Sequence, residues 1–124
     1  MTGSAAARHH AIDYVELTVT DLARAKRFYA EAFDWAFTDY GPAYAGIRGT
    51  GEGAPEAGGL RLDEQPARPG GPLVLLFSAD LDRTVSAVEA AGGRVTNGPY
   101  PFPGGRRFHF ADPDGNELGA WSES

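Results

Sequence analysis

Several residue types and patterns are missing from this sequence, and each absence excludes a class of structure or chemistry. The 124 residues include no cysteine, which excludes disulfides, thiolate nucleophiles and cysteine-ligated zinc or iron–sulfur sites. No run approaches the ~20 consecutive apolar residues of a membrane-spanning helix. Histidines, carboxylates and tyrosines therefore remain as the side chains available for acid–base or metal chemistry.

Basic residues are also scarce, since Lys26 is the only lysine and the formal net charge at pH 7 is −6. Nucleic-acid-binding proteins normally carry a stripe or patch of lysine and arginine, so we expect no nucleic-acid partner. Residues 1–11 lack the apolar centre of a secretory signal, and we expect a cytoplasmic protein with no membrane partner. The length suits one domain with a buried core and a cleft.

The first half of the sequence is typical of a strand, a helix and three further strands. Residues 12–19 alternate apolar and polar side chains, as a two-faced strand does. Asp21 can cap a helix over 22–33, in which apolar residues recur at three- and four-residue spacing. Glycine and proline separate the later apolar stretches. The further strands are expected at 35–40, 43–48 and 59–62.

The same order returns after a connector of proline, glycine and polar residues at 63–72. A strand is expected at 73–78, followed by a helix that opens at Asp80 and ends at Gly92-Gly93. A shift of 59 residues, the spacing between Asp21 and Asp80, brings both strands and both caps into one register. We infer an internal repeat of two βαβββ modules.

The last part of the chain predicts a break and then a hairpin. Gly98-Pro99 is expected to end a short strand at 94–96, and 100–103 (Tyr-Pro-Phe-Pro) to form a stiff aromatic loop that covers the cleft or an interface, or lies free on the surface. The sequence Asp-Pro-Asp-Gly at 112–115 has the residue types of a type I turn. It predicts two antiparallel strands with one packed face and one open face.

Together these motifs resemble the vicinal oxygen chelate superfamily, which includes glyoxalase I, fosfomycin and bleomycin resistance proteins and extradiol dioxygenases. The resemblance rests on the two βαβββ halves, on Val-Glu-Leu-Thr-Val-x-Asp-Leu at 15–22, and on Phe-x-Asp-Pro-Asp-Gly-Asn at 110–116. It implies a single α+β domain over 1–124. Two tandem modules, at about 12–62 and 73–121, would form a curled mixed sheet around a cleft.

The resemblance also implies where a metal would bind. In metal-dependent members, a divalent cation is held by histidine, glutamine or glutamate from the first and last strands of the modules. These positions fall on Tyr14, Leu73 and Gly119, and leucine and glycine supply no donor. We therefore expect no metal cofactor.

Three groups of alternative donors remain open. His9 and His10 precede the first strand, either as displaced ligands or as a solvated terminal pair. His109 lies among aromatic residues and points either into the cleft or along the sheet surface. Glu16, His109 and Glu117 could form a site of two carboxylates and one imidazole, although nothing in their spacing requires them to converge.

The cleft face is expected to combine apolar and aromatic side chains with two carboxylates, the usual composition of a small-molecule pocket. Glu16 is the candidate catalytic residue, because a desolvated carboxyl has a raised pKa and can act as acid or base. Alternatively, Glu16 pairs with Arg48 or Arg107, or caps a loop amide. The candidate ligand-binding residues are Tyr14, Thr18, Tyr44, Arg48, Leu73, Leu75, Phe77, His109, Glu117 and Trp121.

The residues and the resemblance together favour a metal-independent protein that binds or sequesters a drug-like or secondary metabolite in an aromatic, acidic cleft. The alternative is a glyoxalase-like lyase or isomerase, or a dioxygenase, that uses Glu16 or an atypical metal site. The acidic charge balance suits a cationic ligand. Many short members of the family complete their groove from two chains, so the resemblance implies a homodimer.

Overall fold

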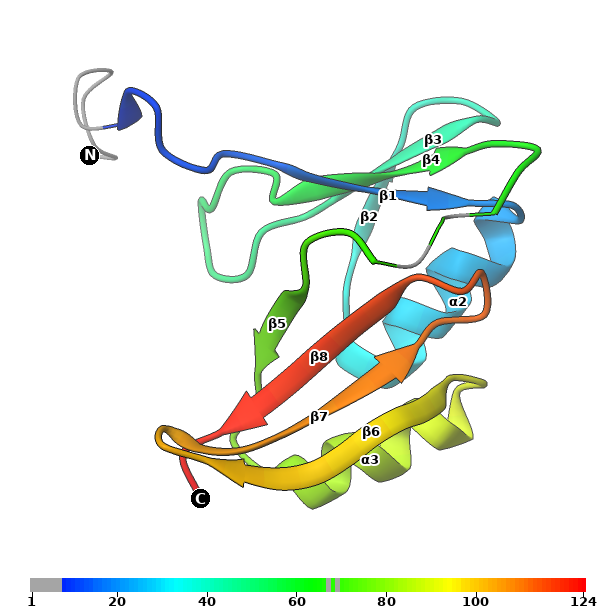
Figure 1. Cartoon of the computed structure of the whole chain (residues 1–124). Helices are drawn as coiled ribbons and strands as arrows, with labels where there is room; N and C mark the ends of the chain where they lie inside the picture. Colours follow the sequence, from blue (N-terminus) through cyan, green and yellow to red (C-terminus); the bar gives the residue numbers. More distant parts are fainter. Residues whose placement is uncertain (1–7, 67, 69) are drawn as a thin grey trace.

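The computed structural model describes residues 8–66, 68 and 70–124, which form two successive βαβββ modules (Figure 1). Residues 1–7, on which part of the expected cytoplasmic location rests, lie outside this description. The first module contains β1 (Val15–Val19), α2 (Leu22–Phe33), β2 (Phe37–Asp39), β3 (Tyr44–Ile47) and β4 (Gly58–Leu62). The second contains β5 (Val74–Phe77), α3 (Leu81–Ala90), β6 (Arg94–Phe102), β7 (Gly105–Ala111) and β8 (Glu117–Ser122).

Each module folds into its own four-stranded mixed sheet. The strand orders are β1-β4-β3-β2 and β5-β8-β7-β6. Each strand of the first sheet therefore has a counterpart at the same edge or central position of the second. β1 runs parallel to β4 and β5 runs parallel to β8, whereas the other neighbours are antiparallel. The shared topology confirms the internal repeat and the α+β class. Neither sheet closes into a barrel.

The two helices begin where the sequence predicts. The side chain of Asp21 accepts a hydrogen bond from the Arg24 backbone N–H at 3.0 Å, and Asp80 does the same for Arg83 at 3.2 Å. α3 ends just before Gly92, whose φ of +104° is accessible to glycine. Among the described residues, no helix combines the length and apolar character needed to cross a bilayer.

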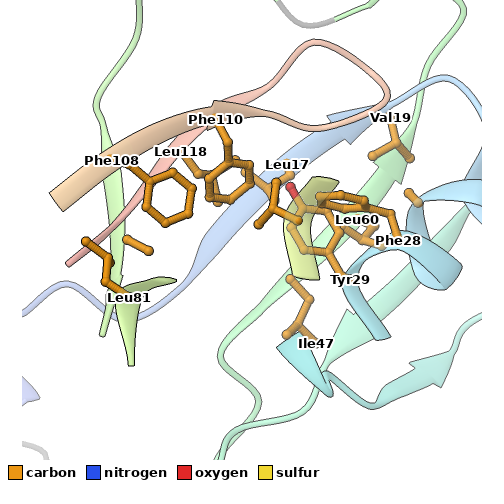
Figure 2. Packing of buried hydrophobic residues seen from close by; sticks show 13 residues of the cluster. Leu17, Val19, Phe28, Tyr29, Ile47, Leu60, Leu81, Phe108, Phe110 and Leu118 are labelled. Atoms are coloured by element: carbon orange, nitrogen blue, oxygen red, sulfur yellow. The ribbon is translucent and has the colours of Figure 1, made fainter. Parts of the chain in front are cut away.

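The two modules share one hydrophobic core (Figure 2). α2 packs on β4, α3 packs on β6, β7 and β8, and the two helices contact each other. Phe110 of β7 meets Phe28 and Phe33 of α2 across the module boundary, with ring centroids 6.3 and 5.5 Å away. Successive side chains of a strand point to opposite faces of the sheet, so every second side chain lies on a face turned away from the core. These two outward faces carry the candidate site.

The turn between β7 and β8 fastens the second module to the first. The Gly115 backbone N–H donates to the Asp112 carbonyl at 3.0 Å, as the predicted turn requires. Asp114 has a fully buried side chain that accepts hydrogen bonds from the backbone and hydroxyl of Thr20, and from Arg24 at 2.8 Å. Figure 1 shows this turn beside the start of α2.

A second set of hydrogen bonds strengthens the same junction. Asp112 accepts from the Tyr29 hydroxyl at 2.7 Å and from the Asn116 side chain at 3.0 Å. The Asn116 amide also donates to the carbonyl of Thr18 at 2.8 Å. Burial raises the pKa of the Asp112 carboxyl, although these hydrogen bonds oppose the rise. The polar residues of the family motif therefore hold the two modules together.

β6 departs from the sequence prediction. We expected Gly98-Pro99 to end a short strand and 100–103 to form a loop, but β6 continues to Phe102. Two register shifts against β7 accommodate the irregular residues. β6 is also an edge strand, where a proline can replace a residue whose N–H would point to the unpaired side. The prediction of an aromatic loop was therefore wrong for Tyr100 and Phe102, which lie on the sheet.

Candidate functional site

The outward face of the first sheet carries a hydrogen-bonded network that we call the tyrosine layer, made of Tyr14, Glu16, Tyr40, Tyr44 and Glu56. The hydroxyls of Tyr14 and Tyr44 lie 2.7 Å apart. The Tyr44 hydroxyl also lies 2.9 Å from Glu16, and the Tyr14 hydroxyl 3.1 Å from Glu56, so the two phenol protons are shared among three contacts. Tyr40 donates to the other oxygen of Glu56 at 2.9 Å. Side chains from separate parts of the first module thus form one connected surface.

Two glycines make room for the tyrosine layer. Gly46 and Gly59 are paired across β3 and β4. A Cβ atom on Gly59 would collide with the ring and hydroxyl of Tyr44, and one on Gly46 would collide with the carboxylate of Glu56. The rings therefore lie close to the strand backbone because these two positions lack side chains.

The environment of the tyrosine layer keeps its phenols protonated. Desolvation raises the pKa of Tyr44 well above its ordinary value, and hydrogen bonds to Tyr14 and Glu16 add to the rise. Desolvation also raises the pKa of Tyr14, while the hydrogen bond to Glu56 raises that of Tyr40. At neutral pH the three phenols are therefore hydrogen-bond donors rather than bases.

Glu16 differs from the desolvated acid or base that the sequence suggested. Its side chain is 44% exposed, so the burial that the hypothesis requires is absent. One carboxylate oxygen accepts from Tyr44, and the other lies 3.3 Å from Nε of Arg61. The alternative prediction, that Glu16 pairs with Arg48 or Arg107, was wrong. Arg61 takes this role because β4 is the strand paired with β1.

The outward face of the second sheet carries an aromatic wall, which we define as Phe77, Tyr100, Phe102, Arg107 and Trp121. The Trp121 ring lies 5.1 Å from that of Phe77 and 6.1 Å from that of Phe102. The Arg107 guanidinium lies 5.5 Å from the rings of both Tyr100 and Phe102, and its Nε donates to the Tyr100 hydroxyl. Phe77 is 59% exposed. Such an open aromatic surface can stack against a planar ligand.

His109 lies beside the aromatic wall, on the outward face of β7. Its Nε2 is 2.8 Å from the Tyr100 hydroxyl, and its Nδ1 is 3.8 Å from a Glu117 oxygen. Glu117 also accepts from the Thr96 hydroxyl at 3.4 Å. Within the described ranges, no three His, Cys, Asp or Glu side chains gather closely enough to hold a metal ion. The suggested site of Glu16, His109 and Glu117 is therefore not assembled.

A groove of about 380 Å³ lies where the two outward faces meet, between the edge strands β1 and β5. Glu16 and Thr18 line it from β1, and Glu117 lines it from β8. Arg61 donates to the Thr18 hydroxyl at 3.0 Å and so connects the groove to the tyrosine layer. The structure thus brings three predicted site residues together in one groove.

The residues at the expected metal positions do not fit a metal. The Tyr14 hydroxyl is engaged with Tyr44 and Glu56. Leu73 precedes β5, and Gly119 is buried in β8, so neither supplies a donor. These three positions therefore do not fit the ligand set that the resemblance implies.

The remaining predicted site residues are dispersed. Leu75 is partly exposed on the outward face of β5. Arg48 follows β3 and donates to the Thr38 hydroxyl at 3.3 Å rather than joining Tyr44 in the network. His9 and His10 are exposed and stack on each other, with ring centroids 3.7 Å apart. These histidines meet no other residue of the site.

Sequence reasoning missed three members of the first face: Tyr40, Glu56 and Arg61. Glu56 lies in a glycine-rich stretch that was interpreted as a flexible turn. Arg61 could have been found, since it lies two residues after Gly59 on β4 and residues two apart on a strand share a face. The long-range pairing of Tyr40 with Glu56 left no local signal in the sequence.

The order of motifs and the fold agree with comparison to a known family. The family model for the Glyoxalase/Bleomycin resistance protein/Dioxygenase superfamily matches residues 11–119. The chain belongs to this superfamily. The resemblance inferred from the sequence is thus confirmed.

Solved structures of the superfamily share the fold. A glyoxalase/bleomycin resistance protein/dioxygenase family enzyme from Burkholderia phytofirmans PsJN aligns with a TM-score of 0.74 at 18% identity, over 91% of this chain and 100% of that one. TnmS3, an antibiotic binding protein from Streptomyces sp. CB03234, aligns with a TM-score of 0.65 at 30% identity, over 94% of this chain and 100% of that one.

Curated relatives include a protein named "Putative glyoxylase CFP32" in Mycobacterium tuberculosis and in Mycobacterium bovis. Each is 30% identical over 115 residues, which cover 88% of this chain. The match spans only 44% of either relative. Whatever the whole relatives do therefore carries over to this chain only as a proposal.

Proposed function

We propose that this superfamily member binds an aromatic small molecule that bears an amine, and holds it without converting it. The aromatic wall carries this proposal. Phe77 presents exposed ring surface beside the half-buried Trp121, and Arg107 is fixed between Tyr100 and Phe102. Stacked aromatic contacts add about 0.5–1.5 kcal/mol per pair beyond buried area, so a planar ligand is the favoured occupant.

The polar part of the ligand is inferred from the groove, which is connected to the wall through Glu117, His109 and Tyr100. Glu16 and Glu117 line this groove, where they outnumber the one arginine, Arg68, and both carboxylates are partly exposed. Carboxylates accept strong hydrogen bonds from an ammonium group. The net charge of −6 also favours a cation over an anion. An aromatic amine therefore matches both the wall and the groove.

Binding without conversion is favoured by the state of the polar groups. Glu16, the candidate acid–base residue, is already paired with Arg61 and hydrogen-bonded to Tyr44. The raised pKa values of Tyr14 and Tyr44 make these phenols poor bases at neutral pH. Of the family metal positions, Leu73 and Gly119 supply no donor and the Tyr14 hydroxyl is already hydrogen-bonded, so no step is assigned to a metal. TnmS3, named as an antibiotic binding protein, supports a binding role.

We also propose that the protein is a homodimer and that the second copy completes the site. Phe77 and Leu75 are exposed large apolar residues on the outward face of the second sheet. Exposed apolar surface of this kind marks an interaction or ligand surface in soluble proteins. In the described residues, no hydrogen bond, ion pair or ring contact links the aromatic wall to the tyrosine layer. A second chain can bring these two surfaces against one ligand.

Titration with aminoacridine, a planar aromatic amine, tests the proposed function by quenching of tryptophan emission, read in a Trp35→Phe background so that Trp121 is the emitter. We expect saturable binding that is weakened about tenfold, or ~1.4 kcal/mol, in Phe77→Ala. Ile12→Ala is the control, because Ile12 is an exposed apolar residue outside the wall. Anthracene carboxylate should bind more weakly than the amine. Equal effects of the two variants, or chromatographic recovery of an altered ligand, would reject the proposal.

A further inference from the structure

A second cavity lies on the core side of the seam between β1 and β5. Its volume is about 240 Å³. It adjoins the groove described above, because Val15, Leu17 and Val74 line both, but Glu16 and Glu117 line only the groove. Its apolar walls include Val15, Leu17, Trp35, Val74, Leu76 and Leu118. Leu17 and Leu118 appear in Figure 2 within the packed core that borders it.

The pocket exists because the two sheets meet without pairing. β1 and β5 are both edge strands, and each pairs only on its other side in the described residues. Val74, Leu76 and Trp35 are consequently only partly buried, although they pack against the core. Protein interiors are normally packed to the density of organic crystals, so an open apolar volume at this point is a place where a ligand gains contacts.

The size and walls of the pocket define the apolar part of its ligand. Apolar cavities of about 150 Å³ in other proteins stay dry and bind benzene. A pocket of about 240 Å³ therefore has room for one aromatic ring with a short side chain. Its walls offer few polar partners for water, since the two polar lining residues are Arg48 and Thr50.

Arg48 defines the polar end of the ligand. Its Nε donates to the Thr38 hydroxyl at 3.3 Å, and it makes no ion pair with any acidic residue that the structure describes. It is exposed at the pocket lining beside Thr50. A guanidinium matches the geometry of a carboxylate and binds it through two parallel hydrogen bonds.

We propose that this pocket is a binding site for a small hydrophobic carboxylate, with the ring or chain between β1 and β5 and the carboxylate on Arg48. The site is separate from the proposed aromatic-amine site. It differs in charge, because Arg48 is the charged residue of the pocket lining, whereas the groove has two carboxylates, Glu16 and Glu117, beside one arginine, Arg68. A cation and an anion can therefore bind the same chain at different places.

Calorimetric titration with phenylpropionate tests the site, with phenylpropionamide as the uncharged analogue. We expect saturable binding of phenylpropionate to the full chain at one site. Arg48→Gln should weaken it about tenfold or more, and the amide should bind wild type as weakly as the carboxylate binds that variant. Arg27→Gln is the matched control, because Arg27 is an exposed arginine on α2 outside the pocket.

A second variant tests the cavity itself. Ala57 lines the pocket and is exposed, so Ala57→Leu fills volume without enlarging a buried residue. We expect this change to abolish phenylpropionate binding while the circular dichroism spectrum stays that of the wild type. Absence of saturable binding to the wild type, or equal binding to Arg48→Gln and Arg27→Gln, overturns the proposal. Unchanged affinity in folded Ala57→Leu does the same.

Discussion

Asp114 and Thr20 lie 94 residues apart in the sequence and are joined by two hydrogen bonds, of which the one from the Thr20 hydroxyl measures 2.6 Å. Asp114 belongs to the turn between β7 and β8, and Thr20 precedes α2. Arg24 adds a charged contact at 2.8 Å to the same carboxylate oxygen. The hydrogen bonds of the motif that identifies the family therefore connect the two modules.

Replacing Asp114 should destabilise the whole fold. Asp114→Ala removes the acceptor of three hydrogen bonds and leaves the half-buried Arg24 without its partner. We expect a loss of about 3 kcal/mol in the free energy of unfolding, measured by urea denaturation. Asp13→Ala is the control, because Asp13 is exposed, and it should stay within about 0.5 kcal/mol of wild type. Equal stability of the two variants would contradict the fastening role.

The tyrosine layer predicts an unusual alkaline titration. The hydrogen bond to Glu56 is the main cause of the raised pKa of Tyr40, and it also raises that of Tyr14. In Glu56→Gln, absorbance at the phenolate band should therefore rise at lower pH than in the wild type. Glu52→Gln is the control on the same exposed segment. Coincident titration curves for the two variants would show that Glu56 does not govern these phenols.

The same shifts predict how stability depends on pH. A phenol whose folded pKa lies above its unfolded value of 10.0 favours the folded state below that pH. This contribution is lost as the pH rises from about 10 through the folded pKa. Tyr44→Phe should therefore flatten the alkaline fall in unfolding free energy, measured by denaturation at neutral pH and above pH 10. An unchanged alkaline limb would contradict the raised pKa of Tyr44.

The absence of side chains at Gly46 and Gly59, beneath the tyrosine layer, predicts that a substitution there destabilises the first sheet locally. Gly59→Ala places a carbon against the Tyr44 ring, so the tyrosine must move outward or the strands must shift. We expect a loss of about 1–3 kcal/mol in the free energy of unfolding together with weaker aminoacridine binding. Gly71→Ala is the matched control for stability only, since nothing lies within 4 Å of a Cβ atom there but the residue lines the groove. Equal stability of both variants would remove the need for a side-chain-free position under Tyr44.

Local signals in the sequence were sufficient for most of the fold. Asp21 and Asp80 cap their helices because carboxylates satisfy free N–H groups, a preference that acts within three residues. The Asp112 turn was found for a similar reason. The strand through Pro99 was missed, because an edge position and register shifts, both set by tertiary pairing, allow proline there.

The site was harder to predict than the fold. Strand alternation placed Tyr14, Glu16 and Thr18 on one outward face, which the structure bears out for their side chains. The partners of these residues were missed, since Glu56 and Arg61 reach them through pairing of distant segments. Exposure is a three-dimensional property, and the desolvation assumed for Glu16 could not be judged from its neighbours in sequence.

The last prediction concerns a ligand site formed by two chains of a homodimer. Phe77 and Tyr44 lie on the outward faces of different sheets, and we propose that a ligand touches Phe77 of one chain and Tyr44 of its partner. Light scattering should then report a dimer for the wild type. Phe77→Glu should give a monomer, because it places a charge on a surface that dimerisation would bury. Ile12→Glu, which changes an exposed apolar residue elsewhere, should remain dimeric.

Mixing variants distinguishes a site shared between chains from a site within one chain. Phe77→Ala and Tyr44→Phe each weaken aminoacridine binding if both residues contact the ligand. After the two variants are unfolded and refolded together, a mixed dimer has one composite site that retains both wild-type residues. Random exchange makes about half of the dimers mixed, so tight binding should return to about a quarter of all sites. If each site lies within one chain, every chain still carries one defect, and the mixture binds no better than its components.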